Sequence, residues 1–178
     1  MQFSNTIQAL QKLGGSVIKE GRGILKKKKK QTRANTLYNE FDYLVTNTQT
    51  SVTLEFEFGR AEDYWQFIDE GVRGAKPEKH PGFKRATNSP FKYSNKMPPR
   101  SAIDRWIVSK PLKAARDENG RFIARKSLAF AIQKSIFEKG IHRTQFFTRP
   151  FTTQLKKQSD KIAKAFADDL EESLEKIL

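Results

Sequence analysis

The change in hydrophobic period between the middle of the chain and its end constrains the fold most strongly. Apolar and polar residues alternate over residues 52–58, which is the period-two pattern of a half-buried strand. Residues 35–45 approach the same alternation, and the polar stretch 46–51 predicts a hairpin connection between the two segments. By contrast, apolar residues recur at nearly every fourth position over residues 155–177, which predicts a long helix. A chain that carries both periods must combine sheet and helix.

The N-terminal segment predicts a basic arm. Residues 4–21 carry apolar residues at helical spacing, but Gly14 and Gly15 weaken the pattern and predict a broken or context-dependent helix. Five consecutive lysines follow: Lys26, Lys27, Lys28, Lys29 and Lys30. Because like charges repel one another, we expect this run to be extended and to become ordered only when it meets a partner.

The middle of the chain predicts helices around a long loop. Residues 60–70 carry a short helical pattern, and a second helix is expected to begin at Ser101. Between them, residues 72–99 contain five of the seven prolines, and a loop of this length is usually functional. Residues 122–139 predict a further helix that ends at Gly140.

These elements predict an α+β fold, in which a small antiparallel β-sheet is packed by helices. We expect three segments: a basic N-terminal helix and arm over residues 1–34, an α+β core domain over 35–151 that includes the Pro-rich loop 72–99, and a C-terminal helix over 152–178. Residues 146–151, at the end of the core domain, are expected to be extended.

The charge of the chain predicts an acidic partner. The 178 residues include 34 Lys and Arg against 20 Asp and Glu, which gives a formal net charge of +14. From residue 151 onward five lysines face six acidic residues, so the preceding residues carry the excess. Nucleic acid, an anionic membrane and an acidic protein surface are the partners that such a field attracts. No apolar run approaches the roughly 18 residues that a membrane span requires.

The residue inventory offers little for catalysis. The chain contains no cysteine, which excludes disulfides, thiolate nucleophiles and cysteine-containing zinc sites. His80 and His142 lie far apart and outside any ligand-spaced pair. The adjacent carboxylates Asp69–Glu70 and Asp168–Asp169 do not share a helical face, so we expect solvated groups or salt-bridge partners. We expect neither enzymatic activity nor a cofactor, metal ion or small-molecule substrate.

The lysine run and the aromatic residues are the candidate binding groups. The run can be a solvated tether, a set of phosphate contacts or a docking segment for an acidic neighbour. The large aromatics can stack on nucleobases, although such residues more often form cores and subunit interfaces. They are Tyr64, Trp65, Trp106, Phe146, Phe147 and Phe151.

A series of short motifs runs along the second half of the chain. In order they are 64–74 (YWQFIDEGVRG), 90–94 (PFKYS), 97–99 (MPP), 106–110 (WIVSK), 124–141 and 146–151 (FFTRPF). In order and spacing they resemble the tail-completion and minor tail proteins of tailed bacteriophages. The resemblance covers the chain from residue 37 to its end. The basic N-terminal arm and the longer loop over residues 75–90 depart from the pattern of that family.

The resemblance implies a virion structural protein without enzymatic activity. Such a protein would form a homo-oligomeric ring in the virion neck or tail, after synthesis in the host cytoplasm. It would join the portal side of the head to the tail, contact other neck and tail proteins, and touch packaged DNA non-specifically. The expected interface or nucleic-acid contacts are Lys26, Lys27, Lys28, Lys29, Lys30, Arg73, Lys76, Lys79, Pro98, Pro99, Trp106, Phe146, Phe147 and Phe151.

Two other functions fit the same charge. The chain can be a monomeric, non-specific nucleic-acid-binding protein that uses the basic arm, which steeply salt-dependent binding would indicate. It can also attach peripherally to an anionic membrane through its N-terminal segment and lysines.

Overall fold

The computed structural model describes residues 3–28, 36–79, 88–109, 116 and 118–175. The chain divides into two compact units, the first formed by Met1–Asp69 with Thr144–Leu178 and the second by Glu70–Arg143. The second unit is therefore inserted into the first, whose two parts meet where the Thr144 amide donates to the Asp69 carbonyl at 3.1 Å. Helices and two small antiparallel sheets confirm the predicted α+β class, but this division differs from the three consecutive segments expected.

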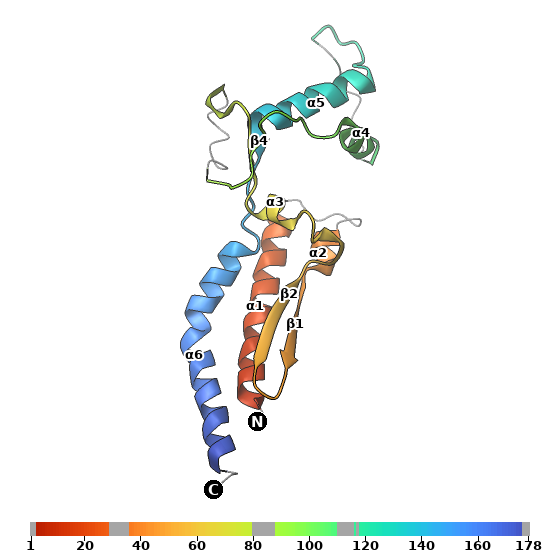
Figure 1. Ribbon diagram of the computed structural model, residues 1–178. Coiled ribbons are helices and arrows are strands. Elements are labelled where there is room, and N and C mark those ends of the chain that lie inside the picture. Colours follow the sequence, from red (N-terminus) through yellow and green to blue (C-terminus); the bar gives the residue numbers. More distant parts are fainter. Residues whose placement is uncertain (1–2, 29–35, 80–87, 110–115, 117, 176–178) are drawn as a thin grey trace. The chain divides into compact units, whose positions relative to one another are not determined.

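The first unit is built on two long helices and a hairpin. Its main elements are α1 (Ser4–Lys27), α6 (Thr148–Glu175), β1 (Asp42–Asn47) and β2 (Val52–Glu57), with the short helices α2 (Thr36–Glu40) and α3 (Trp65–Asp69). The hairpin is antiparallel and runs in register from Asp42 opposite Glu57 to Asn47 opposite Val52, as its period-two pattern predicts. Helix α1 lies between α6 and the hairpin (Figure 1).

Helix α1 is continuous, so of the two expected forms the broken helix is wrong and the helix that depends on its surroundings is the one that forms. Gly14 faces the ring of Tyr43, and a Cβ atom placed there would lie 2.5 Å from Tyr43 Cδ2. A Cβ atom at Gly21 would lie 2.7 Å from the Phe146 carbonyl oxygen. These glycines allow neighbouring groups to approach the helix closely, and the resulting tertiary packing outweighs their low helix propensity.

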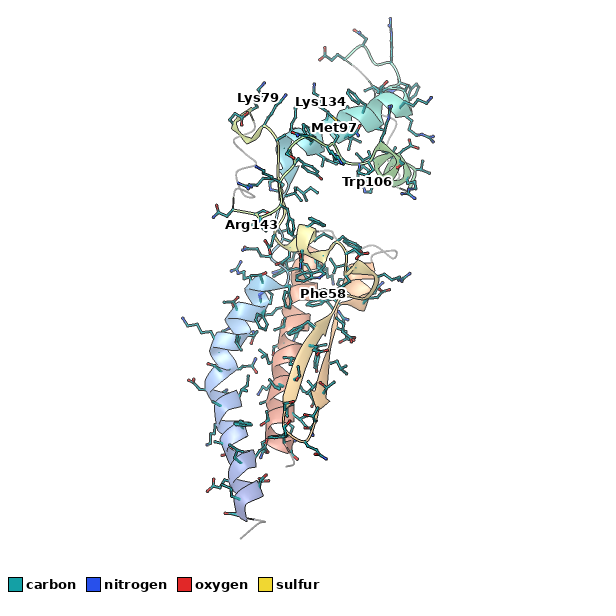
Figure 2. All side chains as sticks on the ribbon, in the orientation of Figure 1. Phe58, Lys79, Met97, Trp106, Lys134 and Arg143 are labelled. Carbon is teal, nitrogen blue, oxygen red and sulfur yellow. The ribbon has the colours of Figure 1, made fainter. Side chains whose placement is uncertain are left out.

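Phenylalanines form the centre of the first core. Phe41 and Phe146 are fully buried and Phe58 is 3% exposed. Figure 2 labels Phe58, which directly follows strand β2. The ring of Phe41 stacks on Phe58 with centroids 5.2 Å apart and meets the edge of Phe146 at 5.4 Å. Phe147 and Phe151 are partly buried against the same cluster. The expectation that Phe146 contacts a partner is therefore wrong, because its ring is already enclosed in its own unit.

Local boundaries in the first unit correct three further expectations. Residues 36–40 are helical rather than extended, since Leu37 and Phe41, four positions apart, are both fully buried. Residues 146–151 are not extended throughout, because α6 begins at Thr148. The helix expected over 60–70 divides into a 3₁₀ turn at Gly59–Ala61 and α3.

The second unit contains two helices and a short sheet. Helices α4 (Arg100–Ser109) and α5 (Arg125–Lys139) pack through Ile103, Ile107 and Ala129. Strands β3 (Val72–Arg73) and β4 (Gly140–Ile141) pair antiparallel. Helix α5 starts three residues later than expected but ends at Gly140, whose φ of +84° favours glycine. The loop expected over residues 72–99 therefore contains regular structure at its start, where β3 is followed by a 3₁₀ turn at Pro77–Lys79.

Candidate functional site: a basic groove between the two long helices

Two buried carboxylates fix the ends of the long helices. Asp169 of α6 is 1% exposed and accepts hydrogen bonds from the backbone amides of Asn5 at 3.0 Å and Thr6 at 2.8 Å. The Thr6 hydroxyl donates to the same carboxylate at 2.6 Å. Burial alone would raise the pKa of Asp169, but these hydrogen bonds outweigh it and hold the pKa below its ordinary value. Asp169 is therefore an ionised cap for the first turn of α1.

Asp69 performs the same task at the start of α6. It is 1% exposed, and it accepts hydrogen bonds from the Phe147 amide at 2.8 Å and from the Thr148 hydroxyl. The expectation that these two carboxylates are solvated or salt-bridged is wrong. The capping role of these two aspartates cannot be predicted from a local sequence pattern, because each aspartate is separated by many residues from the helix start that it caps.

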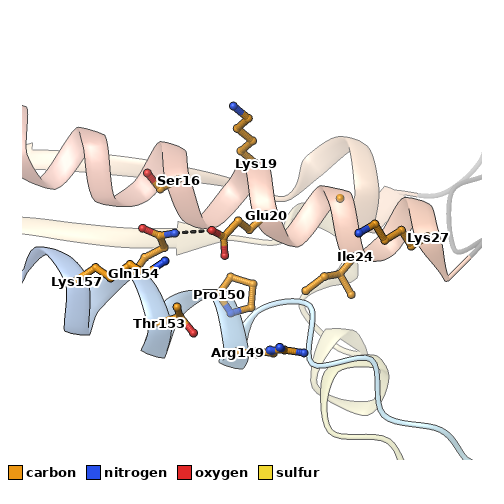
Figure 3. Close-up of a pocket in the computed structure, with 11 residues that line it drawn as sticks. Ser16, Lys19, Glu20, Ile24, Lys27, Arg149, Pro150, Thr153, Gln154 and Lys157 are labelled. Carbon is orange, nitrogen blue, oxygen red and sulfur yellow. Dashed lines mark hydrogen bonds between the residues drawn. The ribbon is translucent and has the colours of Figure 1, made fainter.

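Helices α1 and α6 pack antiparallel, since Asn5 meets Asp169 near one end and Glu20 meets Gln154 near the other. A groove of about 750 Å³ lies between the end of α1 and the start of α6 (Figure 3). Four cations line it: Lys19, Lys27, Arg149 and Lys157. Glu20 is the one carboxylate among the described residues that line the groove, and it accepts a hydrogen bond from the Gln154 side chain across it. The groove thus has an excess of positive charge.

The positive charge continues along the same side of the helix pair. A second hollow, of about 380 Å³, is lined by Lys12, Lys161 and Lys164, with Asp168 as its acidic residue. The α1 residues that line the two hollows recur at helical spacing, so both hollows belong to one seam. Together they present seven cations and two carboxylates.

This arrangement suits binding to an acidic surface. Several cations close together along a groove raise the local potential and attract anionic groups. Within the described ranges, no group of three or more His, Cys, Asp or Glu residues could hold a metal ion. No helix in the described part of the chain is long and apolar enough to cross a membrane.

The predicted lysine run divides at the end of α1. Lys26 and Lys27 form its last turn, so that part of the run is helical rather than extended, and Lys28 follows it. Lys27 lines the basic groove, whereas Lys26 lines another hollow with Tyr38 and Tyr43. Lys29 and Lys30 lie outside the described residues, as does His80.

The second unit holds the remaining predicted contacts. The Arg73 amide donates to the Phe91 carbonyl at 2.9 Å, and Lys76 forms an ion pair with Glu138 at 3.4 Å. Lys79 is exposed. The Pro98 carbonyl accepts a hydrogen bond from Gln133 at 2.6 Å, and Pro99 precedes α4, on which Trp106 is 46% exposed.

The predicted contacts are therefore split between the two units, and of those that the structure describes only Lys27 lines the groove. Sequence reasoning missed Lys19, Arg149 and Lys157. A signal was present, because Lys12, Lys19 and Lys27 are seven and eight positions apart and so share one face of a helix.

Large apolar side chains are also exposed on both units. In the second unit these are Met97, Trp106, Val108, Phe122, Ile123 and Phe130, and in the first Leu44, Phe67, Leu155, Phe166 and Leu174. Comparison of the chain with protein-family models, curated proteins and solved structures finds no match.

Proposed function

We propose that this chain is a structural subunit of a tailed-phage virion. It forms an oligomeric ring in the neck or at the top of the tail and joins the portal side of the head to the tail. The proposal rests on the resemblance of residues 37–178 to tail-completion and minor tail proteins. The observation that carries it is the exposure of large apolar side chains around α4 and α5.

The exposed residues of the second unit have the composition of a protein interface. Trp106 is 46% exposed, Val108 64%, Phe122 66% and Phe130 49%. Aromatic residues are enriched at interfaces, and these four exposed apolar side chains are candidates for a surface that a partner covers. A ring subunit covers such a surface when its neighbours are in place.

The net charge suits the same position in a virion. A basic protein with a formal charge of +14 is attracted to packaged DNA and to an acidic ring beside it. Contact with DNA phosphates would be independent of sequence. Replacing Lys26–Lys30 with Gln should therefore weaken DNA binding or particle assembly, and no change in either would remove this contact from the proposal.

The proposal is tested by the solution mass of a variant with polar residues on α4 and α5. We expect the wild-type chain to form oligomers and the double variant Trp106→Ser/Phe130→Ser to form smaller species, measured by light scattering across a concentration series. Glu118→Ser, an exposed change in the same unit, is the control. Unchanged mass in a folded double variant would remove the α4–α5 surface from the proposal.

The second candidate is a monomeric, non-specific nucleic-acid-binding protein. The basic seam between α1 and α6 favours it, because a row of cations can follow a phosphate backbone. A chain that stays monomeric and binds DNA with a steep salt dependence would support this candidate over a ring subunit.

A further inference from the structure

The C-terminal end of α6 is acidic and extends beyond the helix on which it packs. Residues 168–175 contain five carboxylates and no Lys or Arg. Asp169 lies at the first turn of α1, where it caps the helix. Helix α6 then continues to Glu175, six residues or about 9 Å further at 1.5 Å per residue.

This acidic end combines charge with an exposed apolar residue. Glu171, Leu174 and Glu175 lie three and four positions apart, so they share one face of the helix. Leu174 is 58% exposed, and both glutamates are exposed. The end of α6 therefore presents an apolar side chain between two negative charges.

The basic groove has the complementary pattern at the opposite end of the same unit. Lys19, Lys27 and Lys157 contribute positive charge, while the half-buried Ile24 contributes apolar lining. Because α1 and α6 are antiparallel, the groove adjoins the start of α6 and the acidic segment is at its end. One unit thus carries two surfaces of opposite charge that cannot reach one another within a copy.

We infer that the acidic end of α6 in one copy binds in the basic groove of the next copy. This inference rests on the proposed function, because a ring requires a head-to-tail contact that uses two different surfaces of each subunit. Leu174 contacts Ile24, and Glu171 and Glu175 pair with the lysines around it. A nucleic-acid backbone would match the groove, but it leaves the acidic segment and exposed Leu174 without a role.

The test uses two charge-reversal variants, each of which disables one surface. Lys27→Glu/Lys157→Glu disables the groove, and Glu171→Lys/Glu175→Lys disables the acidic end. Each variant alone should self-associate at least about tenfold more weakly than the wild type, because opposite charges in the contact become like charges. Sedimentation velocity measures the association, and circular dichroism verifies that each variant is folded.

Mixing the two variants gives the sharpest result. Each retains the surface that the other lacks, and the two reversed surfaces are again opposite in charge, so an equimolar mixture should regain the association that neither variant shows alone. The control is Lys156→Glu/Asp160→Lys, which reverses two exposed charges of α6 outside the groove lining and should assemble like the wild type.

Several outcomes would overturn the inference. Folded variants that keep the wild-type mass would exclude this contact while leaving the proposed ring intact. A mixture that remains monomeric would exclude pairing of the two surfaces. A groove variant that assembles normally but loses DNA binding would assign the groove to nucleic acid. A wild-type chain that is monomeric at every concentration would overturn both the contact and the self-assembly on which it rests.

Discussion

At the scale of single residues, two buried aspartates cap the starts of the two long helices. The first backbone amides of a helix have no partner within it, and an acceptor that satisfies them stabilises the helix start. Asp169 supplies that acceptor to α1 and Asp69 supplies it to α6, each from a distant part of the chain. Because the caps are not local, they stabilise the packing of the first unit as well as the individual helices.

Removal of one cap should destabilise the chain measurably. Asp169→Asn keeps the shape of the side chain but removes the charge and one of its acceptor oxygens. We expect a loss of about 1–2 kcal/mol in the free energy of unfolding, which is the usual effect of losing a cap. Urea unfolding measures it, and Asp168→Asn is the control for a neighbouring carboxylate outside the cap. Equal stability of the two variants would contradict the role of Asp169.

The same cap should make stability depend on acid pH. The pKa of Asp169 is lower in the folded chain than its ordinary value of about 3.9. Its stabilising effect is therefore complete above that value and is lost as the pH falls through the folded pKa. The stability difference between wild type and Asp169→Asn should be constant from about pH 7 to pH 5 and shrink below about pH 4. A stability difference between the two proteins that grows as the pH falls would contradict the role of ionised Asp169 as a cap.

At the scale of elements, close packing decides where sequence patterns hold. The alternation over residues 52–58 predicts β2, whose alternate side chains are half-buried. The fourfold spacing over 155–177 predicts the long helix α6, although Leu155, Phe166 and Leu174 of that stripe are exposed. The sequence pattern fails in α1, because Gly14 and Gly15 suggest a break whereas tertiary contacts keep the helix continuous. It fails also at Leu37 and Phe41, whose spacing fits both a strand and a helical turn until their shared core is known.

Two glycines of α1 should respond oppositely to the same substitution. A methyl group at Gly21 meets the Phe146 carbonyl and the ring of Phe41, so Gly21→Ala should destabilise the chain by about 1–3 kcal/mol. A methyl group at Gly23 has nothing within 4 Å, so Gly23→Ala should stabilise it by up to about 1 kcal/mol. Thermal or urea unfolding compares the two. Similar effects at both positions would mean that packing does not determine the role of Gly21.

At the scale of the whole molecule, the chain is one unit inserted into another. The insertion begins after Asp69 and ends before Thr144, where the backbone of the first unit is joined by hydrogen bonds. This topology explains why the candidate groove was difficult to predict. Helices from opposite ends of the sequence form it, so the individual basic residues are visible in the sequence but their convergence is not.

The insertion predicts that the first unit folds without the second. Replacing residues 70–143 with a short Gly-Ser linker should keep α1, α6 and the hairpin, since the excision points already adjoin. Circular dichroism and cooperative urea unfolding would measure this. A truncated chain without a cooperative transition would mean that the second unit is needed for the fold of the first.

The proposed role as a virion subunit is tested most directly by the composition of particles. Quantitative mass spectrometry of purified tailed particles, made in cells that express the chain with the remaining virion proteins, gives its copy number per particle. We predict a fixed copy number that equals a whole ring, with the chain located in the neck or tail by negative-stain imaging. Absence of the chain from otherwise complete particles would contradict the proposal.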